Sequence, residues 1–540
     1  MTHPKRARLI PHLLALLPIL ALLGGAVWLQ ATDGLGDGGM NNPFTYIALL
    51  LAAGLYGLWF LLFSGQKGST KLGTLLGVGA LIGAAAAVVR VDGFSGSMVP
   101  QWHWAWEKSE SADLTAEALV AAAEAGVDLK TTTPQDFPGF LGPNRNGSVD
   151  GLRLAPSWDA PGPELLWKQP VGGGWSGFAV VNGVAITHEE RGEGQLVVAR
   201  DVLTGVELWR YGTSATFNHP LGGPGPRTTP LVHDGLVYAQ DSAGHLLCLE
   251  GSTGALVWEH DLQAEYGMTP ELEEKMVQFG RSCSPLAVDD MLIMPVGGNP
   301  AVKQAGLAAF DLRTGELRWE GPPRHFSHAS PLLATVAGVR QVLVMNEESA
   351  SGHDPATGNL LWEYAWPGKT GGDANNTSPT PVGTDGVLVS KGYGRGSSLL
   401  RIQTPEPGEQ PSTQTVEPVW ASRRALRTKL TNPVLRGDHA YSLSDGILEC
   451  TDLATGKRVW RDGRYGHGQV LLVGEHLLVL SEEGELLLIA ADPERENEVL
   501  GSFQAVDGVT WNTFALYGDI VLLRNGHEAG AWRLPTRVGE

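Results

Sequence analysis

Several charged and amide side chains stand where short apolar segments begin or turn, and together they could bind an anionic ligand. Arg227 in GPGPRTTP and Arg281 in GRSCSP occupy equivalent positions, and two arginines can hold a carboxylate or phosphate through paired hydrogen bonds. The alternative is that each arginine is solvated or paired with a nearby carboxylate such as Glu189. The full set of candidates for this site is Arg227, Arg281, His188, Glu189, Asn376, Lys391 and Arg395.

Small polar residues precede proline at several of the same segment entries. They are Ser284, Ser330, Ser378 and Asn432. We expect them to cap strand entries, with the proline as the first strand residue, rather than to bind a ligand.

The histidines and cysteines show no spacing that is typical of a metal or redox site. The 15 histidines form no HxH, HxxxH or HExxH pattern, and the close pair His325 and His328 has no third ligand beside it. The three cysteines form no CxxC, CxxCH or adjacent pair, so we expect Cys248, Cys283 and Cys450 to be free thiols of a β core. The sequence therefore predicts no metal site and identifies no catalytic residue.

The overall charge bears on the class of partner. The chain has 58 acidic and 39 basic residues, for a formal net charge of −19. Nucleic-acid binding needs a basic surface that displaces counterions from phosphates. The composition therefore argues against a nucleic-acid partner.

The N-terminal part of the chain differs in composition from the rest. Three apolar runs, 9–30, 44–63 and 72–89, each approach the roughly 20 residues needed to cross a bilayer. Cations precede the first run and lie between the second and third, so the bias of cytoplasmic loops toward Lys and Arg puts the N-terminus in the cytoplasm. A cleaved signal peptide followed by two helices is the alternative. We expect 1–91 to be an anchor with about three transmembrane helices in the cytoplasmic (inner) membrane, with the rest of the chain on the periplasmic side.

A spacer, 92–135, is expected to follow the anchor, with one short helix over about 111–126. Its stretch WHWAW, Trp102 to Trp106, places three indoles at alternate positions. They suit the membrane–water interface, where amphipathic rings collect, or equally the rim of the following domain.

A phrase that recurs through the remaining chain, 136–540, indicates a repeat architecture. It reads DLRTGELRW at Asp311–Trp319, and related copies end at other tryptophans. Each copy joins two of four short apolar segments, which is typical of one four-stranded blade of a β-propeller. We expect the glycine to supply the positive φ of the turn and the tryptophan to pack on the adjacent blade. These docking residues are Trp209, Trp258, Trp319, Trp362 and Trp460.

The repeats give an all-β, eight-bladed propeller behind the helical anchor. The entries of the first strands fall near Phe178, Thr229, Ser284, Ser330, Ser378, Thr431, His467 and Thr510. The last repeat is one strand short, and Glu164–Pro170 is expected to complete it, because ring closure removes exposed sheet edges. Seven blades is the alternative count.

The phrase A-x-D-x-x-T-G-x-x-x-W, at Ala199–Trp209 and Ala309–Trp319, resembles the tryptophan-docking repeat of the PQQ-like (quinoprotein alcohol dehydrogenase-like) eight-bladed propellers. That family includes calcium- and PQQ-dependent dehydrogenases as well as non-enzymatic members, such as the propeller of the outer-membrane assembly machinery. The dehydrogenases generally hold PQQ beneath two adjacent cysteines and bind Ca²⁺ through Glu, Asn and Asp. This chain has no adjacent cysteine pair, so the resemblance offers PQQ and calcium no matching site.

The expected function is therefore a non-catalytic binding or scaffolding module, held at the membrane by its helices, with protein partners or a small ligand at the propeller mouth. The alternative is a divergent PQQ-dependent membrane dehydrogenase that oxidises an alcohol or sugar. Between two repeats, Thr269-Pro270 followed by glutamates predicts a short helix that ends at Gly280. We expect this helix to cover part of the mouth.

Overall fold

The computed structural model describes residues 6–32, 38–106, 126–368, 374–403 and 414–537. The chain divides into two compact units, Met1–Lys108 and Ser109–Glu540. The helix predicted at about 111–126 falls almost entirely outside the described residues.

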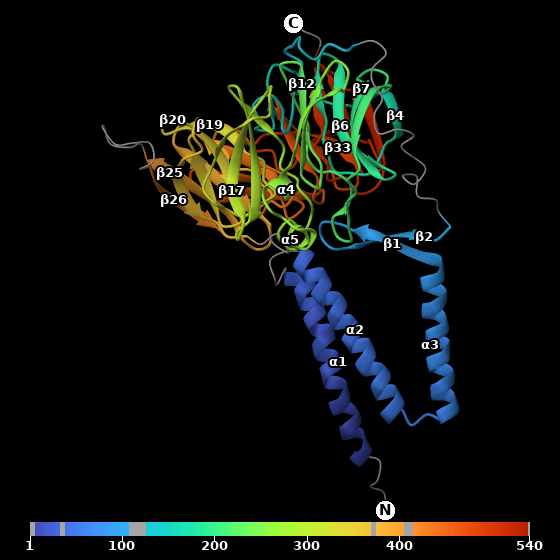
Figure 1. The fold of residues 1–540 in the computed structure, drawn as a ribbon. Helices are drawn as coiled ribbons and strands as arrows, with labels where there is room; N and C mark the ends of the chain where they lie inside the picture. The colour runs from blue at the N-terminus through green and yellow to red at the C-terminus, as the bar shows by residue number, and fades with distance from the viewer. Residues whose placement is uncertain (1–5, 33–37, 107–125, 369–373, 404–413, 538–540) are drawn as a thin grey trace, which may run out of the picture. The chain divides into compact units, whose positions relative to one another are not determined.

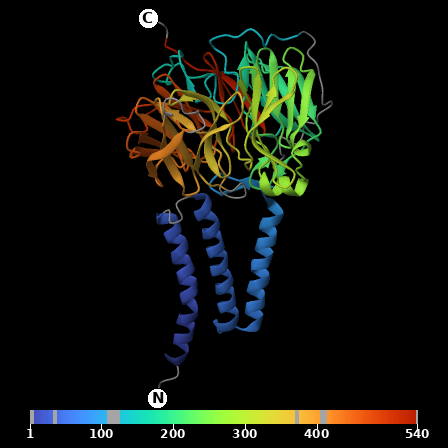
Figure 2. The same ribbon diagram turned by 60° about the vertical axis from the view of Figure 1, so that its left-hand side comes forward.

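The first unit contains three helices and a hairpin. The helices are α1 (Arg6–Thr32), α2 (Gly38–Phe63) and α3 (Gly68–Val88), and the α2–α3 turn lies at the same end of the unit as the start of α1 (Figure 2). The stretch Gly39–Phe63 and the helix α3 are each long and apolar enough to cross a membrane by length and composition. The apolar stretch described in α1, Leu16–Thr32, is shorter. A strand hairpin follows α3 directly, β1 (Val89–Phe94) with β2 (Pro100–Trp104).

The described residues of the second unit are all-β apart from two short helices. They form eight antiparallel sheets of four strands, one of which gains a fifth, parallel strand, and one two-stranded hairpin. We number the sheets 1 to 8 by the chain order of strands β5, β11, β15, β19, β23, β27, β31 and β35; several of the strands are labelled in Figure 1.

Sheets 1 to 4 are consecutive in sequence. Sheet 1 contains β5 (Ala179–Val181), β6 (Val184–Arg191), β7 (Gly194–Asp201) and β8 (Glu207–Thr213), and sheet 2 contains β11 (Leu231–His233), β12 (Leu236–Gln240), β13 (His245–Glu250) and β14 (Leu256–Asp261). Sheet 3 contains β15 (Leu286–Val288), β16 (Met291–Asn299), β17 (Lys303–Asp311) and β18 (Leu317–Glu320). Sheet 4 contains β19 (Leu332–Val336), β20 (Val339–Met345), β21 (Ser349–His353) and β22 (Leu360–Ala365).

Sheets 5 to 8 continue the pattern. Sheet 5 contains β23 (Thr380–Val382), β24 (Gly386–Lys391), β25 (Gly396–Gln403) and β26 (Thr415–Ser422), and sheet 6 contains β27 (Val434–Arg436), β28 (His439–Ser444), β29 (Ile447–Asp452) and β30 (Arg458–Arg464). Sheet 7 contains β31 (Gln469–Val473), β32 (His476–Leu480), β33 (Glu485–Ala490) and β34 (Val499–Gln504), with β3 (Ser148–Val149) parallel to β31. Sheet 8 contains β35 (Ala515–Tyr517), β36 (Ile520–Arg524), β37 (Glu528–Arg533) and β4 (Glu164–Pro170).

The strand predicted to complete the last repeat does so. β4 (Glu164–Pro170) pairs antiparallel with β37, and Trp167 lies opposite Ala531. A segment from the start of the second unit thus becomes the outer strand of sheet 8, which covers an edge that would otherwise be exposed.

The repeated phrase joins neighbouring sheets through its glycine and its tryptophan. The Nε1 of Trp209 donates to Gly251 O of sheet 2 at 2.9 Å, and its ring covers Gly254, where a Cβ would come within 2.6 Å of it. Gly254 also has a φ of +76°, which glycine adopts at no steric cost. The side chains that contact the glycine of the next sheet in this way are Trp167, Trp209, Trp258, Trp319 and Trp420.

Trp362 and Trp460 pack differently from the other tryptophans, because the following sheet lacks the Thr-Gly phrase. Trp362 is buried among Val387, Val389 and Leu400 of sheet 5. Trp460 is buried in a cluster that includes strands of sheet 7. Both therefore bury their indoles against the next sheet, but without a glycine seat.

The small polar residues at the strand entries link each sheet to its neighbour. Thr229 N donates to Ser284 Oγ at 3.0 Å, and Ser284 N donates to Ser330 Oγ at 2.9 Å. Hydrogen bonds between a side chain and the backbone connect all eight sheets in order and join sheet 8 back to sheet 1. The other links are Gly177 to Thr229, Ser378 to Ser330, Ser378 to Asn432, Gln469 to Leu430 and to Trp511, and Asn512 to Ser176.

Two short helices separate sheets 2 and 3. They are α4 (Leu262–Glu265) and α5 (Pro270–Met276). The predicted helix start is confirmed, since the Thr269 side chain caps α5 by accepting from Leu272 N at 3.3 Å.

Candidate functional site

The predicted site residues lie at one end of the sheets, which we call the mouth face. It comprises the segments that enter the first strands, such as 175–178 and 227–230, and the turns between second and third strands, such as 191–194 and 241–244. Antiparallel pairing puts these segments together, as Phe178 and Thr187 flank the paired residues Ala179 and Ile186.

Arg227 holds a hairpin of backbone on this face. Its guanidinium donates to three carbonyl oxygens, those of Gly222 (2.7 Å), Gly225 (2.7 Å) and Gly223 (3.1 Å). These residues belong to a hairpin of β9 (Asn218–His219) and β10 (Gly223–Pro224). The guanidinium also lies 4.6 Å from the ring centre of Phe217. Burial lowers the pKa of Arg227 to about 9, which leaves it charged at neutral pH.

Arg281 is enclosed rather than open to a ligand. Its side chain is fully buried and donates to Glu273 Oε1 of α5 at 2.7 Å and to Val296 O at 2.8 Å. An external anion would have to displace both contacts. The buried pair instead fastens α5 onto sheet 3.

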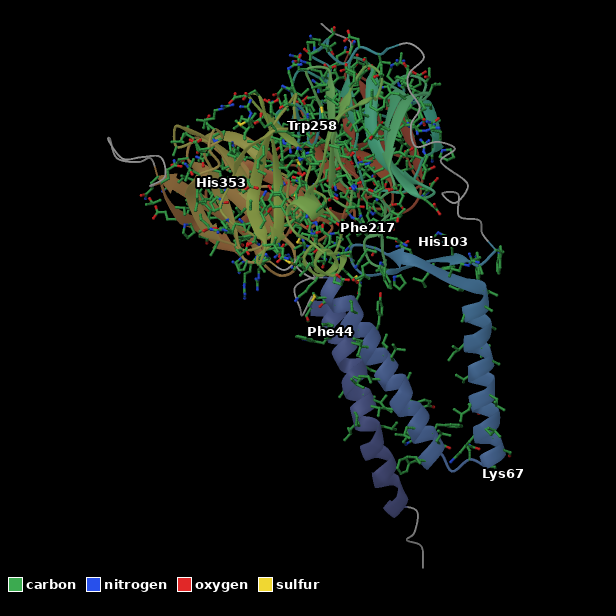
Figure 3. All side chains as sticks on the ribbon, in the orientation of Figure 1. Phe44, Lys67, His103, Phe217, Trp258 and His353 are labelled. Carbon is green, nitrogen blue, oxygen red and sulfur yellow. The ribbon has the colours of Figure 1, made fainter. Side chains whose placement is uncertain are left out.

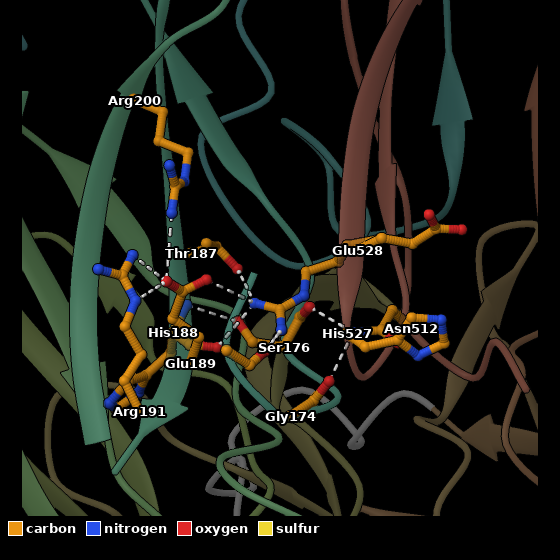
Figure 4. A network of polar contacts seen from close by, with 12 residues as sticks. Gly174, Ser176, Thr187, His188, Glu189, Arg191, Arg200, Asn512, His527 and Glu528 are labelled. Carbon is orange, nitrogen blue, oxygen red and sulfur yellow. Dashed lines mark hydrogen bonds and ion pairs between the residues drawn. The ribbon is translucent and has the colours of Figure 1, made fainter. Parts of the chain in front are cut away.

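Glu189 stands at the centre of a buried cluster of arginines. It accepts from Arg191 and from Arg200 (3.2 Å), and Arg524 lies 3.7 Å from its other oxygen; Figure 4 shows the carboxylate between Arg191 and Arg200. Burial opposes ionisation, but the three guanidinium groups outweigh it and lower the pKa of Glu189 to about 2. The carboxylate is therefore ionised at neutral pH and surrounded by guanidinium groups.

His188 lies beside this cluster and is also fully buried. Burial lowers its pKa to about 4, although Asp241 acts in the opposite direction. The imidazole is neutral at pH 7. Arg524 donates to its backbone oxygen at 3.1 Å and to Thr187 Oγ1 at 3.1 Å, so that sheet 8 is tied to sheet 1.

The remaining predicted residues lie in sheet 5 and at its entry. Lys391 is buried, with Nζ 3.5 Å from Pro367 O. The guanidinium of Arg395 lies 4.5 Å from the ring centre of Trp366. Asn376 is half-buried, whereas its neighbour Asn375 donates to Asn346 O at 2.8 Å.

Of the aromatic residues of the mouth face, Trp511 could be placed there from the sequence, whereas Trp175, Phe217 and Phe279 were not singled out. Trp175 and Trp511 have ring centres 4.7 Å apart, and Phe279 lies 4.8 Å from His219. Phe217, labelled in Figure 3, lies beneath Arg227. The sequence signal was their place in or near the strand entries. Together these rings make part of the mouth face apolar.

A hollow of about 520 Å³ lies between sheets 3 and 4. Its charged groups are already paired, because Arg324 donates to both oxygens of Glu363 (2.8 and 2.7 Å) and His325 contacts Glu348. These residues bring together charges of both signs and leave the hollow with no single dominant charge.

The described residues do not fit the PQQ and calcium site of the dehydrogenases. Within the ranges that the structure describes, no group of three or more His, Cys, Asp or Glu side chains could hold a metal ion. The cysteines are free and buried, at positions far apart in sequence. Arg227, Arg281 and Glu189 contact groups of the protein itself.

The sheets, the docking tryptophans and the strand-entry bonds define a repeat protein of the β-propeller class. A family model described as "Outer membrane protein assembly factor BamB" matches residues 154–322 and 193–462, which together exceed half of the chain. The protein therefore belongs to this family of PQQ-like repeat propellers.

Individual relatives are distant. BamB of Shewanella oneidensis is 23% identical over 285 residues, which cover 51% of this chain and 66% of the relative. The crystal structure of BamB from Moraxella catarrhalis is 14% identical, with a TM-score of 0.48, and covers 69% of this chain and all of that one. A quinohemoprotein alcohol dehydrogenase from Comamonas testosteroni is 13% identical, with a TM-score of 0.40, and covers 76% and 82% of the two chains.

Proposed function

We propose that the protein is a membrane-anchored, non-catalytic scaffold whose mouth face binds protein partners on the outer side of the inner membrane. The observation that carries this proposal is membership of the BamB-type family. The contacts of two mouth residues support it, because Arg281 is paired with Glu273 and Glu189 with arginines of the protein itself, and a group held in this way is not positioned as an acid or base for a substrate.

The scaffold we propose is a closed ring of eight blades. The circuit of strand-entry bonds supports closure, since Asn512 of sheet 8 donates to Ser176 O of sheet 1 at 2.8 Å. Arg524 supports it as well, because it donates from sheet 8 to Gly172 O at 2.6 Å, just before sheet 1. A closed ring would hold the mouth segments at fixed positions, as a binding face requires.

The anchor in this proposal is multi-pass, with α2 and α3 as spans and α1 as a third. Its orientation follows from Lys67 and Lys71 at the α2–α3 turn, which cytoplasmic loops favour. The second unit would then follow α3 on the outer side.

The test against the dehydrogenase alternative is a titration of the full chain in detergent with PQQ and Ca²⁺, followed by tryptophan fluorescence and a dye-linked assay on alcohols and sugars. The proposal predicts no saturable quenching and no turnover. Saturable quenching at low PQQ concentration together with turnover would establish the enzyme and overturn the scaffold.

A further inference from the structure

The β1–β2 hairpin continues directly from a helix that could cross a membrane. α3 ends at Val88 and β1 begins at the next residue, and no side chain of α3 is buried. The hairpin belongs to the same compact unit as the helices. Its surroundings are therefore set by where α3 leaves the bilayer.

The two faces of the hairpin have opposite character. In the register, Val89 lies opposite Trp104 and Val91 opposite Trp102, and opposed residues of a strand pair share a face. This face is apolar. The residues between them, Arg90 opposite His103, put polar side chains on the other face, because successive side chains alternate.

The indoles on the apolar face are open and touch one another. Trp102, Trp104 and Trp106 are 58%, 39% and 66% exposed. Trp104 stacks on Trp106 with ring centres 5.0 Å apart, and meets Trp102 edge-on at 5.6 Å. Each indole combines a large apolar ring with one N–H donor, a combination enriched where apolar and wet surroundings meet.

Polar contacts fix the hairpin at one end of the helices. Asn42, near the start of α2, donates from Nδ2 to Ser97 O in the hairpin turn at 2.7 Å. Gln30, near the end of α1, donates to Asn42 Oδ1 at 2.8 Å. Lys67 lies at the opposite end of α3 from His103 (Figure 3). The hairpin thus marks one boundary of the helical unit, and the lysines mark the other.

We propose that the β1–β2 hairpin is a membrane-interface element, whose apolar face rests on the outer leaflet with Trp102, Trp104 and Trp106 at the level of the lipid headgroups. The inference rests on the proposed membrane anchor. We assign lipid as the partner of the apolar face because this face is continuous with a helix suited to the bilayer. The opposite, polar face directs Arg90 and His103 toward water. The hairpin fixes the depth at which α3 ends.

The test uses the full chain in vesicles whose lipids carry bromine near the glycerol end or near the methyl end of the acyl chains. Fluorescence of the unaltered protein minus that of W102F/W104F/W106F reports only the three indoles, and phenylalanine preserves an aromatic ring at each position. As matched controls, the same subtraction with W59F reports Trp59 in α2, and the subtraction with W158F reports Trp158 in the second unit.

The proposal predicts that the hairpin difference signal is quenched more by bromine near the glycerol end than by bromine near the methyl end. The W158F signal should be unaffected. If the hairpin signal is not quenched while the W59F signal is, the hairpin proposal is wrong and the anchor stands. If neither signal is quenched, the anchor itself is wrong.

Discussion

Replacement of Glu189 by glutamine tests whether the arginine cluster stabilises the junction of sheets 8 and 1. The carboxylate is fully buried and is the common partner of Arg191, Arg200 and Arg524. A neutral amide of nearly the same shape would remove the acidic partner of Arg524 and would leave Arg191 and Arg200 with Glu207 alone. Removal of one partner from a buried pair costs more than the pair contributes, because the other charge stays buried.

Two estimates of the magnitude agree. The pKa of Glu189 is about 2, against an ordinary value of 4.5, and at about 1.4 kcal/mol per pH unit this favours the ionised form by roughly 3 kcal/mol on folding. Loss of one partner of a buried ion pair costs about 3 to 5 kcal/mol. We therefore expect Glu189→Gln to lower the free energy of unfolding by about 3 kcal/mol.

The assay is urea unfolding of the full chain in detergent, followed by tryptophan fluorescence. Glu193→Gln is the matched control, since Glu193 is exposed in the adjoining turn and should change stability by less than about 0.5 kcal/mol. Because the folded pKa of Glu189 is lowered, its contribution is present above pH 4.5 and is lost as the pH falls through about 2. Equal stability of the two variants at pH 7 would refute the role assigned to the cluster.

Two further changes test how neighbouring sheets are joined. Gly254→Ala should lower the free energy of unfolding by about 1 to 3 kcal/mol more than Gly338→Ala does. Both glycines have a φ of +76°, but only at Gly254 would a Cβ contact Trp209. Equal losses of stability in urea unfolding would contradict docking of the tryptophan on the glycine. Ser284→Ala should cost about 1 to 3 kcal/mol in the same assay, because it leaves the buried Thr229 N–H without its acceptor; a stability unchanged from the unaltered protein would show that the strand-entry bonds do not hold the sheets.

Local features of the fold could be predicted from the sequence because each depends on a few neighbouring residues. The Asp-x-x-Thr-Gly turn is one, since Asp311 Oδ1 accepts from Thr314 N at 2.8 Å within the same turn. The cap at Thr269 is another. The outer strand Glu164–Pro170 was found by counting repeats, as periodicity shows which strand a blade lacks.

The use of the charged residues could not be predicted in the same way. Arg281 was interpreted as a ligand-binding residue, yet its partners are Glu273 and Val296, and burial of its guanidinium depends on how α5 packs. Arg524 and Glu189 are close in space although they are far apart in the sequence, so no local sequence pattern identifies the pair. A lone arginine in the apolar run IVLLRN was a signal that a buried partner had to exist.

Photo-cross-linking in native membranes shows whether the mouth face binds protein partners. A photoreactive residue replaces Leu221 in the hairpin that Arg227 holds, or Val419 on the outer strand of sheet 5, positions that are 38% and 40% exposed. The scaffold predicts discrete protein adducts from position 221 and none above background from position 419. Adducts that are absent from position 221, or equal at both positions, would contradict it.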